Sequence, residues 1–249
     1  MPMEERTALL VGPKGMEKLK KARVALFGLG GVGSYTAEAL ARAGVGQLTL
    51  VDDDKVSESN LNRQLVALRS TVGVLKTQAA AQRIADINPD CRVEQVNLFY
   101  TPATADQIPF EGRFDYIIDA VDTVTAKLEI LARAQAAGVP VISCMGTGNK
   151  IYPEKLTLTT LEKTTGCPLA RVMRKECRAR GIKNVKVVYS TEEARPLYPP
   201  MEAKEAPAGE EPIRPGKPKD NVPGSISFVP GAAGLILAGA VIRELAGLE

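Results

Sequence analysis

Histidine and tryptophan are absent from the 249-residue sequence, and aromatic residues make up only 4% of it. Without histidine the chain lacks the commonest general base and the commonest zinc ligand. This absence excludes a Ser-His-Asp hydrolase and a histidine-based metal site. Any chemistry must therefore use lysine, arginine, carboxylates, backbone amides or a bound metal.

Cysteine is scarce, and the four that are present, Cys91, Cys144, Cys167 and Cys177, form no Cys-x-x-Cys pair. No secretory leader precedes them, which predicts reduced thiols and a cytoplasmic location. We expect Cys144, at the end of a strand, to be a small buried apolar residue. Cys167 precedes a proline, and we expect it to be the most exposed candidate for sulfur chemistry.

Net charge and long apolar runs are also limited. A formal charge of only +3 excludes a bulk polycation, so any basic surface must be local. The longest apolar run, residues 232–242, is shorter than the roughly 20 residues that span a bilayer. We expect it to form a buried helix, with Gly234 and Gly239 allowing close packing, and we expect no membrane insertion.

The first half of the chain alternates between strand and helix patterns. A short apolar run at residues 23–28 ends in Gly28-Leu-Gly-Gly-Val-Gly33, a helical pattern follows at 34–43, and a second apolar run covers 47–52. Such a unit implies parallel strands joined by a right-handed crossover.

The later segments extend this pattern and then change it. We expect helices at 74–87 and 126–137, strands at 92–99, 114–119 and 139–144, and then strands at 155–161, 185–190 and 225–229. The fold class is therefore α/β, a Rossmann-like doubly wound mixed sheet with a parallel N-terminal part and antiparallel C-terminal strands. Residues 20–148 would form the nucleotide-binding part, and 149–249 a substrate part with a flexible proline-rich loop at 196–223.

The glycine motif has the spacing of a dinucleotide-binding turn. Gly28, Gly30 and Gly33 match the fingerprint, in which glycines let the backbone approach phosphates at a helix N-terminus. Asp52 ends the next strand, where a carboxylate holds ribose hydroxyls. The fingerprint alone would suggest NAD or FAD.

The segment after Asp52 favours a triphosphate instead. Asn60, Arg63 and Gln64 follow the second strand, and Lys76 opens the next helix. Arginine binds phosphate oxygens bidentately, and a lysine ammonium beside first-turn amides also attracts phosphate. Hydride transfer does not need such a cluster.

Asp119-Ala-Val-Asp122 closes another strand at the carboxyl edge of the same sheet. One of the two carboxylates could hold magnesium against the phosphates, because this ion uses one or two carboxylates in nucleotide sites.

Together these motifs resemble the adenylation domain of ubiquitin-activating enzymes and of their bacterial relatives in thiamine and molybdopterin synthesis, over about residues 6–148. The resemblance implies that ATP is bound with Mg²⁺, that Arg63, Lys76 and Asp122 are catalytic, and that Asp122 is the metal ligand. It also implies a homodimer, since the family's arginine reaches into the partner subunit's site. The nucleotide-binding residues that it implies are Gly28, Gly30, Gly31, Gly33, Asp52, Asp54, Asn60, Arg63, Gln64, Lys76 and Asp122.

Two branches of that superfamily compete. The sulfur-carrier branch usually has two Cys-x-x-Cys zinc knuckles, which this sequence lacks. The tRNA threonylcarbamoyladenosine dehydratases are similar over nearly the whole length, so residues 1–249 would form a single ThiF-type adenylation domain. The motifs that carry this second similarity are Asn62-Arg63-Gln64, Ile87-Asn-Pro-Asp-Cys-Arg-Val93, Asp115-Tyr-Ile-Ile-Asp-Ala-Val-Asp122, Pro168-Leu-Ala170 and Tyr189-Ser-Thr-Glu192.

This branch implies ATP-dependent cyclisation of threonylcarbamoyladenosine next to the tRNA anticodon, through adenylation of the threonyl carboxylate. The partners implied are a tRNA anticodon stem-loop and a cysteine-desulfurase or sulfur-acceptor system. Three alternatives stay open: a ubiquitin-like or sulfur-carrier adenylyltransferase, an NAD-dependent oxidoreductase, and a non-catalytic tRNA-binding scaffold.

Residues 171–186 contain seven basic residues and one acidic residue, Glu176. Such a run fits either a solvated helix face or a surface for the phosphates of the anticodon stem-loop. With few aromatics available for base stacking, we expect backbone contacts to dominate any RNA binding.

Overall fold

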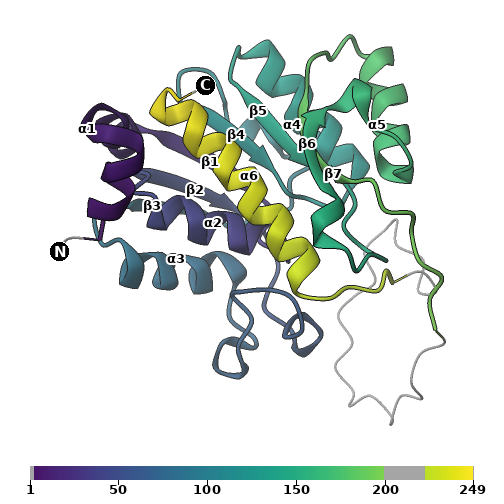
Figure 1. The fold of residues 1–249 in the computed structure, drawn as a ribbon, viewed down its shortest axis with the longest axis horizontal. Helices are drawn as coiled ribbons and strands as arrows, with labels where there is room; N and C mark the ends of the chain where they lie inside the picture. The colour runs from purple at the N-terminus through teal and green to yellow at the C-terminus, as the bar shows by residue number, and fades with distance from the viewer. Residues whose placement is uncertain (1–2, 199–221, 249) are drawn as a thin grey trace.

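The computed structural model describes residues 3–198 and 222–248, and its seven described strands form one sheet in the order β3-β2-β1-β4-β5-β7-β6 (Figure 1). All neighbours pair in parallel except β6, which runs antiparallel to β7. The expected doubly wound mixed sheet is thus confirmed. Its strands are β1 (Arg23–Phe27), β2 (Gln47–Val51), β3 (Arg92–Val96), β4 (Tyr116–Asp119), β5 (Val141–Cys144), β6 (Leu156–Thr160) and β7 (Lys186–Ser190).

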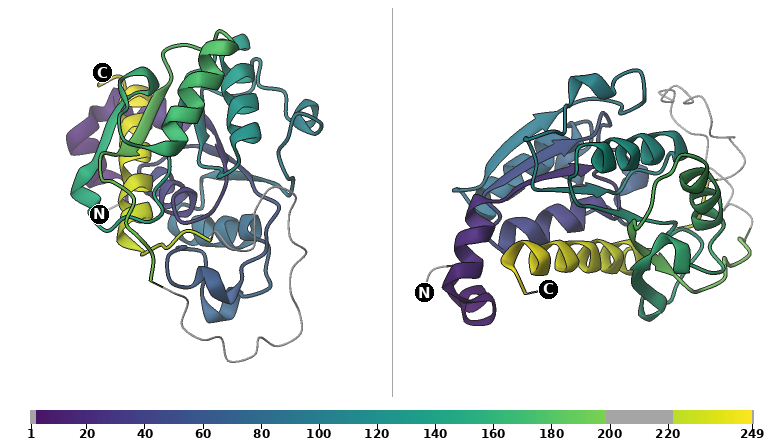
Figure 2. Two further views of the ribbon diagram at one scale, coloured as in Figure 1. Left: turned by 90° about the vertical axis from the view of Figure 1, so that its right-hand side faces the viewer. Right: turned by 90° about the horizontal axis from the view of Figure 1, so that it is seen from above.

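Helices cover both faces of this sheet (Figure 2). The α-helices are α1 (Glu5–Lys21), α2 (Gly33–Arg42), α3 (Lys76–Ile87), α4 (Val124–Ala136), α5 (Pro168–Ala179) and α6 (Phe228–Ala246). One core cluster joins α1, α2, α3 and α6 to the sheet, and a second joins α4 to it, with Leu26 and Phe27 facing opposite clusters. Buried side chains alternate between the two faces because successive residues of a strand point to opposite sides.

The strand order places a topological switch point between β1 and β4. From β1 the chain moves outward through β2 to β3, then returns to form β4 on the other side of β1. Phe27 at the end of β1 is in register with Val51 of β2 and with Asp119 of β4. Gly28, Asp52 and Ala120 therefore emerge at one sheet edge, where open α/β folds bind their ligands.

The expected buried helix at 232–242 is α6, which is longer than the apolar run. Its 19 residues have a mean hydropathy of 1.6, so by length and composition it could cross a membrane. Its packing is that of a core helix: Val229, Ala233, Leu237 and Val241 are fully buried. At Gly234 an added Cβ would lie 2.3 Å from the carbonyl oxygen of Val32, so glycine is required where α6 crosses α2.

The strand expected at 225–229 is wrong. Its alternating residues Ser-Ile-Ser-Phe-Val match a strand period, but α6 begins at Phe228. Pro230 lies in the first turn of α6, where a missing backbone N–H breaks no helical hydrogen bond. That proline was the sequence signal for a helix start.

Helix α1 was not anticipated. It is interrupted at Gly12, which has φ 72° and ψ 168°, and Pro13 follows directly. Because the two residues break the helical period, the sequence shows two short fragments instead of one amphipathic helix.

Asn149 joins the two described chain segments that flank the expected proline-rich loop. Its backbone N–H donates to the Gly224 carbonyl and its Oδ1 accepts from the Gly224 N–H, both at 2.7 Å, and its carbonyl accepts from Arg195 N–H at 2.8 Å. Residues 199–221 of the loop expected at 196–223 lie outside the described residues. Asn62 Nδ2 donates to the Ser225 carbonyl at 3.0 Å, so the chain re-enters beside the candidate phosphate residues.

Candidate nucleotide-binding site

The turn after β1 can be built only with glycine at two positions. Gly28 has φ 87°, and a Cβ there would lie 2.7 Å from the carbonyl oxygen of Ala120. A Cβ on Gly33 would lie 1.8 Å from the carbonyl oxygen of Gly28. The turn is therefore compact, and α2 begins at Gly33 with its first-turn amides at the switch point, as an anion site requires.

Asp52 connects this turn to the end of β2. Its Oδ2 accepts from Leu29 N–H at 2.7 Å, and its Oδ1 accepts from Asp54 N–H at 2.8 Å. Burial raises the pKa of Asp52, an effect that the Lys76 charge and the two N–H donors oppose. Each carboxylate oxygen can accept a further hydrogen bond, which suits a ribose diol.

Lys76 is buried at the start of α3 and belongs to the same network. Its Nζ donates to Asp54 Oδ2 at 2.8 Å, and its backbone N–H donates to the Asp54 carbonyl at 2.9 Å. Only 5% of the residue is exposed. The structure thus brings together the glycine turn, Asp52, Asp54 and Lys76 through consecutive hydrogen bonds.

Gln64 faces the glycine turn from the segment after β2. It is 7% exposed, and its Oε1 has no hydrogen-bond partner among the described residues. Its Nε2 is 4.0 Å from the position of a Cβ on Gly30. A buried acceptor without a partner is costly, so this amide is placed where a ligand or an ordered water would satisfy it.

Arg63 and Asn60 are held differently. A Cβ on Gly31 would lie 3.5 Å from Arg63 Cγ, so the arginine stem packs on the turn, while its Nη1 donates to the Ser59 carbonyl at 2.8 Å. Asn60 Oδ1 accepts from Ser57 N–H at 3.3 Å, so its side chain is used to fold its own turn. Its Nδ2 donates to Ser59 Oγ at 3.4 Å, and the second N–H of this amide can donate to a phosphate oxygen without breaking the Oδ1 bond.

Of the two carboxylates after β4, Asp119 is not available to a metal. It is fully buried, and its Oδ2 accepts from Lys127 Nζ at 2.9 Å and from the Ser143 hydroxyl. Lys127 also donates to the Cys144 carbonyl at 2.7 Å. Asp122, three residues further along, is exposed at the ligand edge.

Lys127 was missed by sequence reasoning, although a signal existed. In α4 its neighbours Ala126, Ile130, Leu131 and Ala134 are buried, and 127, 130, 131 and 134 share one helical face. A lysine on the apolar face of a helix is buried, so it needs a buried carboxylate partner. Asp119 is the carboxylate that ends the preceding apolar strand.

The acidic run after β2 is a second place that could hold a cation. One carboxylate oxygen from each of Asp52, Asp53 and Asp54 lies within 4.8 Å of the others. Lys76 already supplies one positive charge there through Asp54.

The four cysteines are free and buried, so Cys144 is as expected, but the expected exposure of Cys167 is wrong. Cys167 is 3% exposed because its side chain joins the core cluster formed by Met145, Ala170 and their neighbours. Burial raises the pKa of Cys144 to about 12 and that of Cys177 to about 11. Neither environment favours a reactive thiolate.

Comparison with known proteins supports a nucleotide-binding assignment for this edge. A model of the ThiF family matches residues 4–249. The chain belongs to the ThiF family. It is 43% identical over 241 residues to the tRNA threonylcarbamoyladenosine dehydratase of Bacillus subtilis. The aligned region covers 96% of this chain and 93% of that protein.

A solved structure is similar over the full fold. The Escherichia coli tRNA N6-threonylcarbamoyladenosine dehydratase in complex with ATP matches with a TM-score of 0.82 and 32% identity, covering 98% of this chain and 94% of that one. The sulfur-carrier branch is also represented: the E. coli ThiS adenylyltransferase is 32% identical over 79% of this ThiF-family chain and 78% of that protein.

Proposed function

We propose that this protein uses ATP to cyclise threonylcarbamoyladenosine in tRNA, next to the anticodon, with net loss of water. The observation that carries the nucleotide part is the chain of hydrogen bonds from Leu29 N–H through Asp52 and Asp54 to Lys76, which holds an ammonium beside the glycine turn. The substrate part is supported by the similarity to threonylcarbamoyladenosine dehydratases over nearly the whole chain.

The reaction begins with attack of the threonyl carboxylate on the α-phosphate of ATP, which releases pyrophosphate and forms an acyl-adenylate. A nitrogen or oxygen of the substrate then attacks the activated carbonyl carbon and expels AMP. One carboxylate oxygen leaves with AMP, so the nucleoside loses the elements of water. The protein needs no nucleophile of its own, in agreement with its buried thiols.

The roles of individual residues follow from their positions. Asp52 would hold the ribose, and the glycine turn with Gln64 would hold the phosphates. Lys76 and Arg63 would stabilise the negative charge that develops on the phosphates, which is electrostatic preorganisation and not acid-base catalysis. Asn60 would bind phosphate through Nδ2, while its Oδ1 supports the turn that presents Arg63 and Gln64.

Magnesium fits the donor set at this edge, because the carboxylate of exposed Asp122 is a hard oxygen ligand. We propose Asp122 as the protein ligand. When bound with ATP, the ion would neutralise phosphate charge.

We further propose a homodimer in the cytoplasm. Leu9 and Leu10 of α1 are 82% and 85% exposed, and clustered apolar side chains at a surface are typical of interfaces. Sedimentation analysis at micromolar concentration tests this, and a monomer would contradict it. A cysteine-desulfurase or sulfur-acceptor partner would have to bring its own accessible thiol, since the four cysteines of this chain are buried.

The function is tested by incubating the protein with ATP, Mg²⁺ and threonylcarbamoylated tRNA, followed by digestion and mass spectrometry of the nucleosides. We expect a nucleoside lighter by one water, with AMP and pyrophosphate formed in equal amounts. An unchanged nucleoside mass would refute the proposal, whatever the level of ATP binding.

A carrier-protein adenylyltransferase is the second candidate, favoured by the similarity to the ThiS adenylyltransferase. It predicts that pyrophosphate release depends on a carrier with a C-terminal Gly-Gly and is indifferent to tRNA. The sequence has no Cys-x-x-Cys pair, and this is why we place it second.

A further inference from the structure

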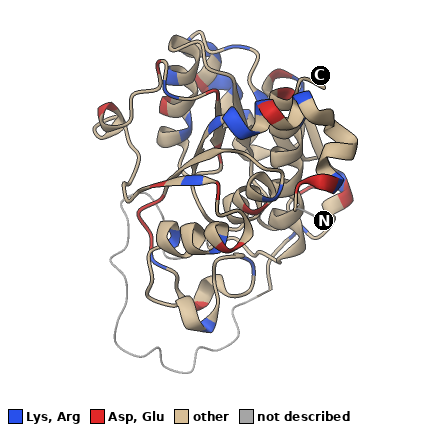
Figure 3. Ribbon diagram, turned by 90° about the vertical axis from the view of Figure 1, so that its left-hand side faces the viewer, with Lys and Arg blue, Asp and Glu red and all other residues tan. Residues whose placement is uncertain are grey.

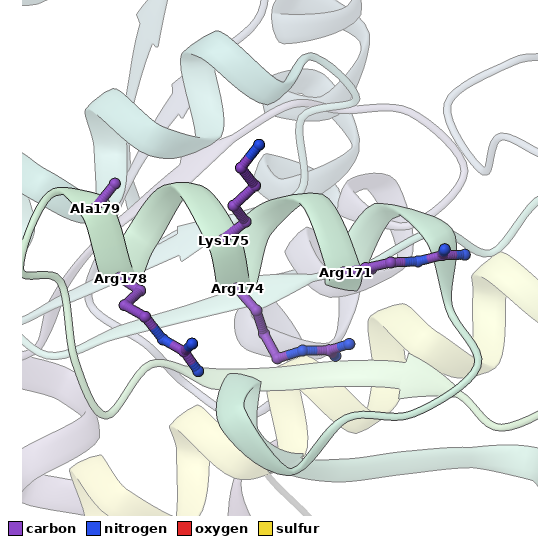
Figure 4. Close-up of a pocket in the computed structure, with 5 residues that line it drawn as sticks. All are labelled: Arg171, Arg174, Lys175, Arg178 and Ala179. Atoms are coloured by element: carbon purple, nitrogen blue, oxygen red, sulfur yellow. The ribbon is translucent and has the colours of Figure 1, made fainter.

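The exposed side of α5 carries four basic residues on successive turns. Arg171, Arg174, Lys175 and Arg178 are spaced at i, i+3, i+4 and i+7, while Ala170, Met173 and Cys177 on the opposite side are buried in the core. The four basic side chains, with Ala179, line a hollow of about 360 Å³ (Figure 4). We call this surface the α5 basic face.

Charge on the α5 basic face is not compensated within the described part of the chain. No described residue forms an ion pair or hydrogen bond with the side chains of Arg171, Lys175 or Arg178, and all three residues are exposed. Arg174 donates only to the carbonyl and hydroxyl of Thr164, which are neutral acceptors.

Six other arginines of the described chain are held to carboxylates by ion pairs. They are Arg23, Arg42, Arg83, Arg113, Arg133 and Arg180. On the side of the molecule that carries both chain ends, basic and acidic residues lie interspersed (Figure 3). The α5 basic face differs from these regions because it gathers four basic residues that have no ion-pair partner among the described residues.

This arrangement is unfavourable in the free protein. Arg171 and Lys175 are like charges at i and i+4, as are Arg174 and Arg178, and each such pair destabilises a helix. Arg171 also lies in the first turn of α5, which contains no acidic residue, so it is repelled by the positive end of the helix dipole. A polyanion bound to this face would relieve both effects.

The α5 basic face is fixed rigidly to the nucleotide edge. Leu128 and Leu131 of α4 pack in one core cluster with α5, and α4 begins two residues after Asp122. The first turn of α5 lies close to the loop after β5, since a Cβ on Gly146 would be 3.9 Å from Leu169 Cβ. A polyanion on this face would therefore be held at a fixed position relative to the ATP site.

Resting on the proposed function, we infer that the α5 basic face binds the phosphate backbone of the tRNA substrate. Seven residues of helix span about 10 Å, over which a nucleic-acid backbone presents several phosphates. The contacts are to phosphates and not to bases, because no aromatic side chain lines the hollow. The α5 basic face would thus supply binding affinity and fix the position of the tRNA on the protein. Residues outside this face would recognise the bases.

The test compares two triple variants with the same change in charge. One is Arg171→Gln/Lys175→Gln/Arg178→Gln. The control, Lys14→Gln/Lys18→Gln/Lys21→Gln, removes three exposed charges with identical spacing from α1, at the other end of the molecule (Figure 1). Binding of a fluorescently labelled full-length tRNA is measured between about 50 and 200 mM salt, the range over which phosphate contacts are lost.

We expect the α5 variant to bind tRNA about tenfold or more weakly at the lower salt and to reduce the salt slope by about two to three. The KM for tRNA should rise while kcat at saturating tRNA and the thermal shift caused by ATP stay as in the wild type. Equal weakening in both triple variants, or none in the α5 variant, would overturn the inference.

Two further outcomes separate this inference from the proposed function. If the wild type binds tRNA through α5 but never changes the nucleoside mass, the proposed function fails and the surface assignment survives. If the α5 variant keeps full tRNA affinity but loses pyrophosphate release stimulated by an acidic carrier protein, the face belongs to that carrier and the RNA assignment is wrong.

Discussion

The segment around the ends of β1 and β2 and the exposed side of α5 organise charge in opposite ways. After β1 and β2, Asp52, Asp54 and Lys76 satisfy one another through short hydrogen bonds before any ligand is present. On α5, Arg171, Lys175 and Arg178 have no such partners among the described residues. The first region is preorganised, so ATP would add its contacts to a network that already exists. The second has no carboxylate partner in the described part of the chain, so a bound polyanion would supply the counter-charges.

The largest effect that would test this contrast is expected from Lys76→Ala. If the preorganised ammonium stabilises the phosphates, turnover should fall by about 10³-fold, since removing one such group costs roughly 10²–10³ in rate. Release of pyrophosphate in the presence of substrate tRNA measures the loss, and circular dichroism checks the fold.

Lys55→Ala is the matched control, because Lys55 is an exposed lysine in the segment between β2 and α3. It should retain near-wild-type turnover. Full activity of Lys76→Ala would show that the buried network is structural and that the phosphates bind elsewhere.

A second variant, Lys127→Met, tests whether the stability of the nucleotide-binding part also depends on the buried ion pair between Lys127 and Asp119. The substitution leaves the fully buried Asp119 unpaired, and breaking such a pair costs about 3–5 kcal/mol of stability. Urea unfolding followed by circular dichroism measures this loss.

The double variant Asp119→Asn/Lys127→Met should recover part of the lost stability, because no buried charge remains. As a surface control, Lys21→Met breaks an exposed pair with Glu17 and should leave the urea midpoint unchanged. If Lys127→Met shifted the midpoint no more than Lys21→Met, the buried pair would not support the β4 edge.

The smallest effect is expected in a thiol-alkylation experiment, which tests whether the cysteines in and near α5 are accessible in the folded protein. With a pKa of about 12, Cys144 would be ionised to about one part in ten thousand at pH 8. Iodoacetamide followed by mass spectrometry should find Cys144, Cys167 and Cys177 unmodified in the folded protein and alkylated after unfolding. Rapid reaction of Cys167 in the folded protein would show that its thiol is accessible and would support a sulfur-transfer role for the α5 region.

Much of the fold could be predicted from the sequence, because its signals are local. Apolar runs ending in glycine or aspartate fixed β1, β2 and β4, and the parallel connection rule placed their ends at one edge. The strand expected at 225–229 failed because Ser-Ile-Ser-Phe-Val has a strand period, whereas burial of Val229 and Ala233, four residues apart, favours a helix.

The residues of the site could be predicted from the sequence, but the hydrogen-bond partners of each residue could not. The sequence placed Asp52, Asp54 and Lys76 near one ligand, but only the fold shows Lys76 bound to Asp54. The pattern of residues alone allowed either Asp119 or Asp122 as the magnesium ligand, and the family resemblance selected Asp122. Burial distinguishes them, since Lys127 neutralises the first from a different helix and leaves the second exposed.

The hydrogen bonds of Asn149 determine how the chain tolerates changes in length. Because Arg195 and Gly224 are both tied to this residue, the described part of the chain holds these two positions together by itself. A change in sequence confined to the segment between them is therefore expected to leave α6 and the sheet in place, which makes this segment the natural position for engineering the protein.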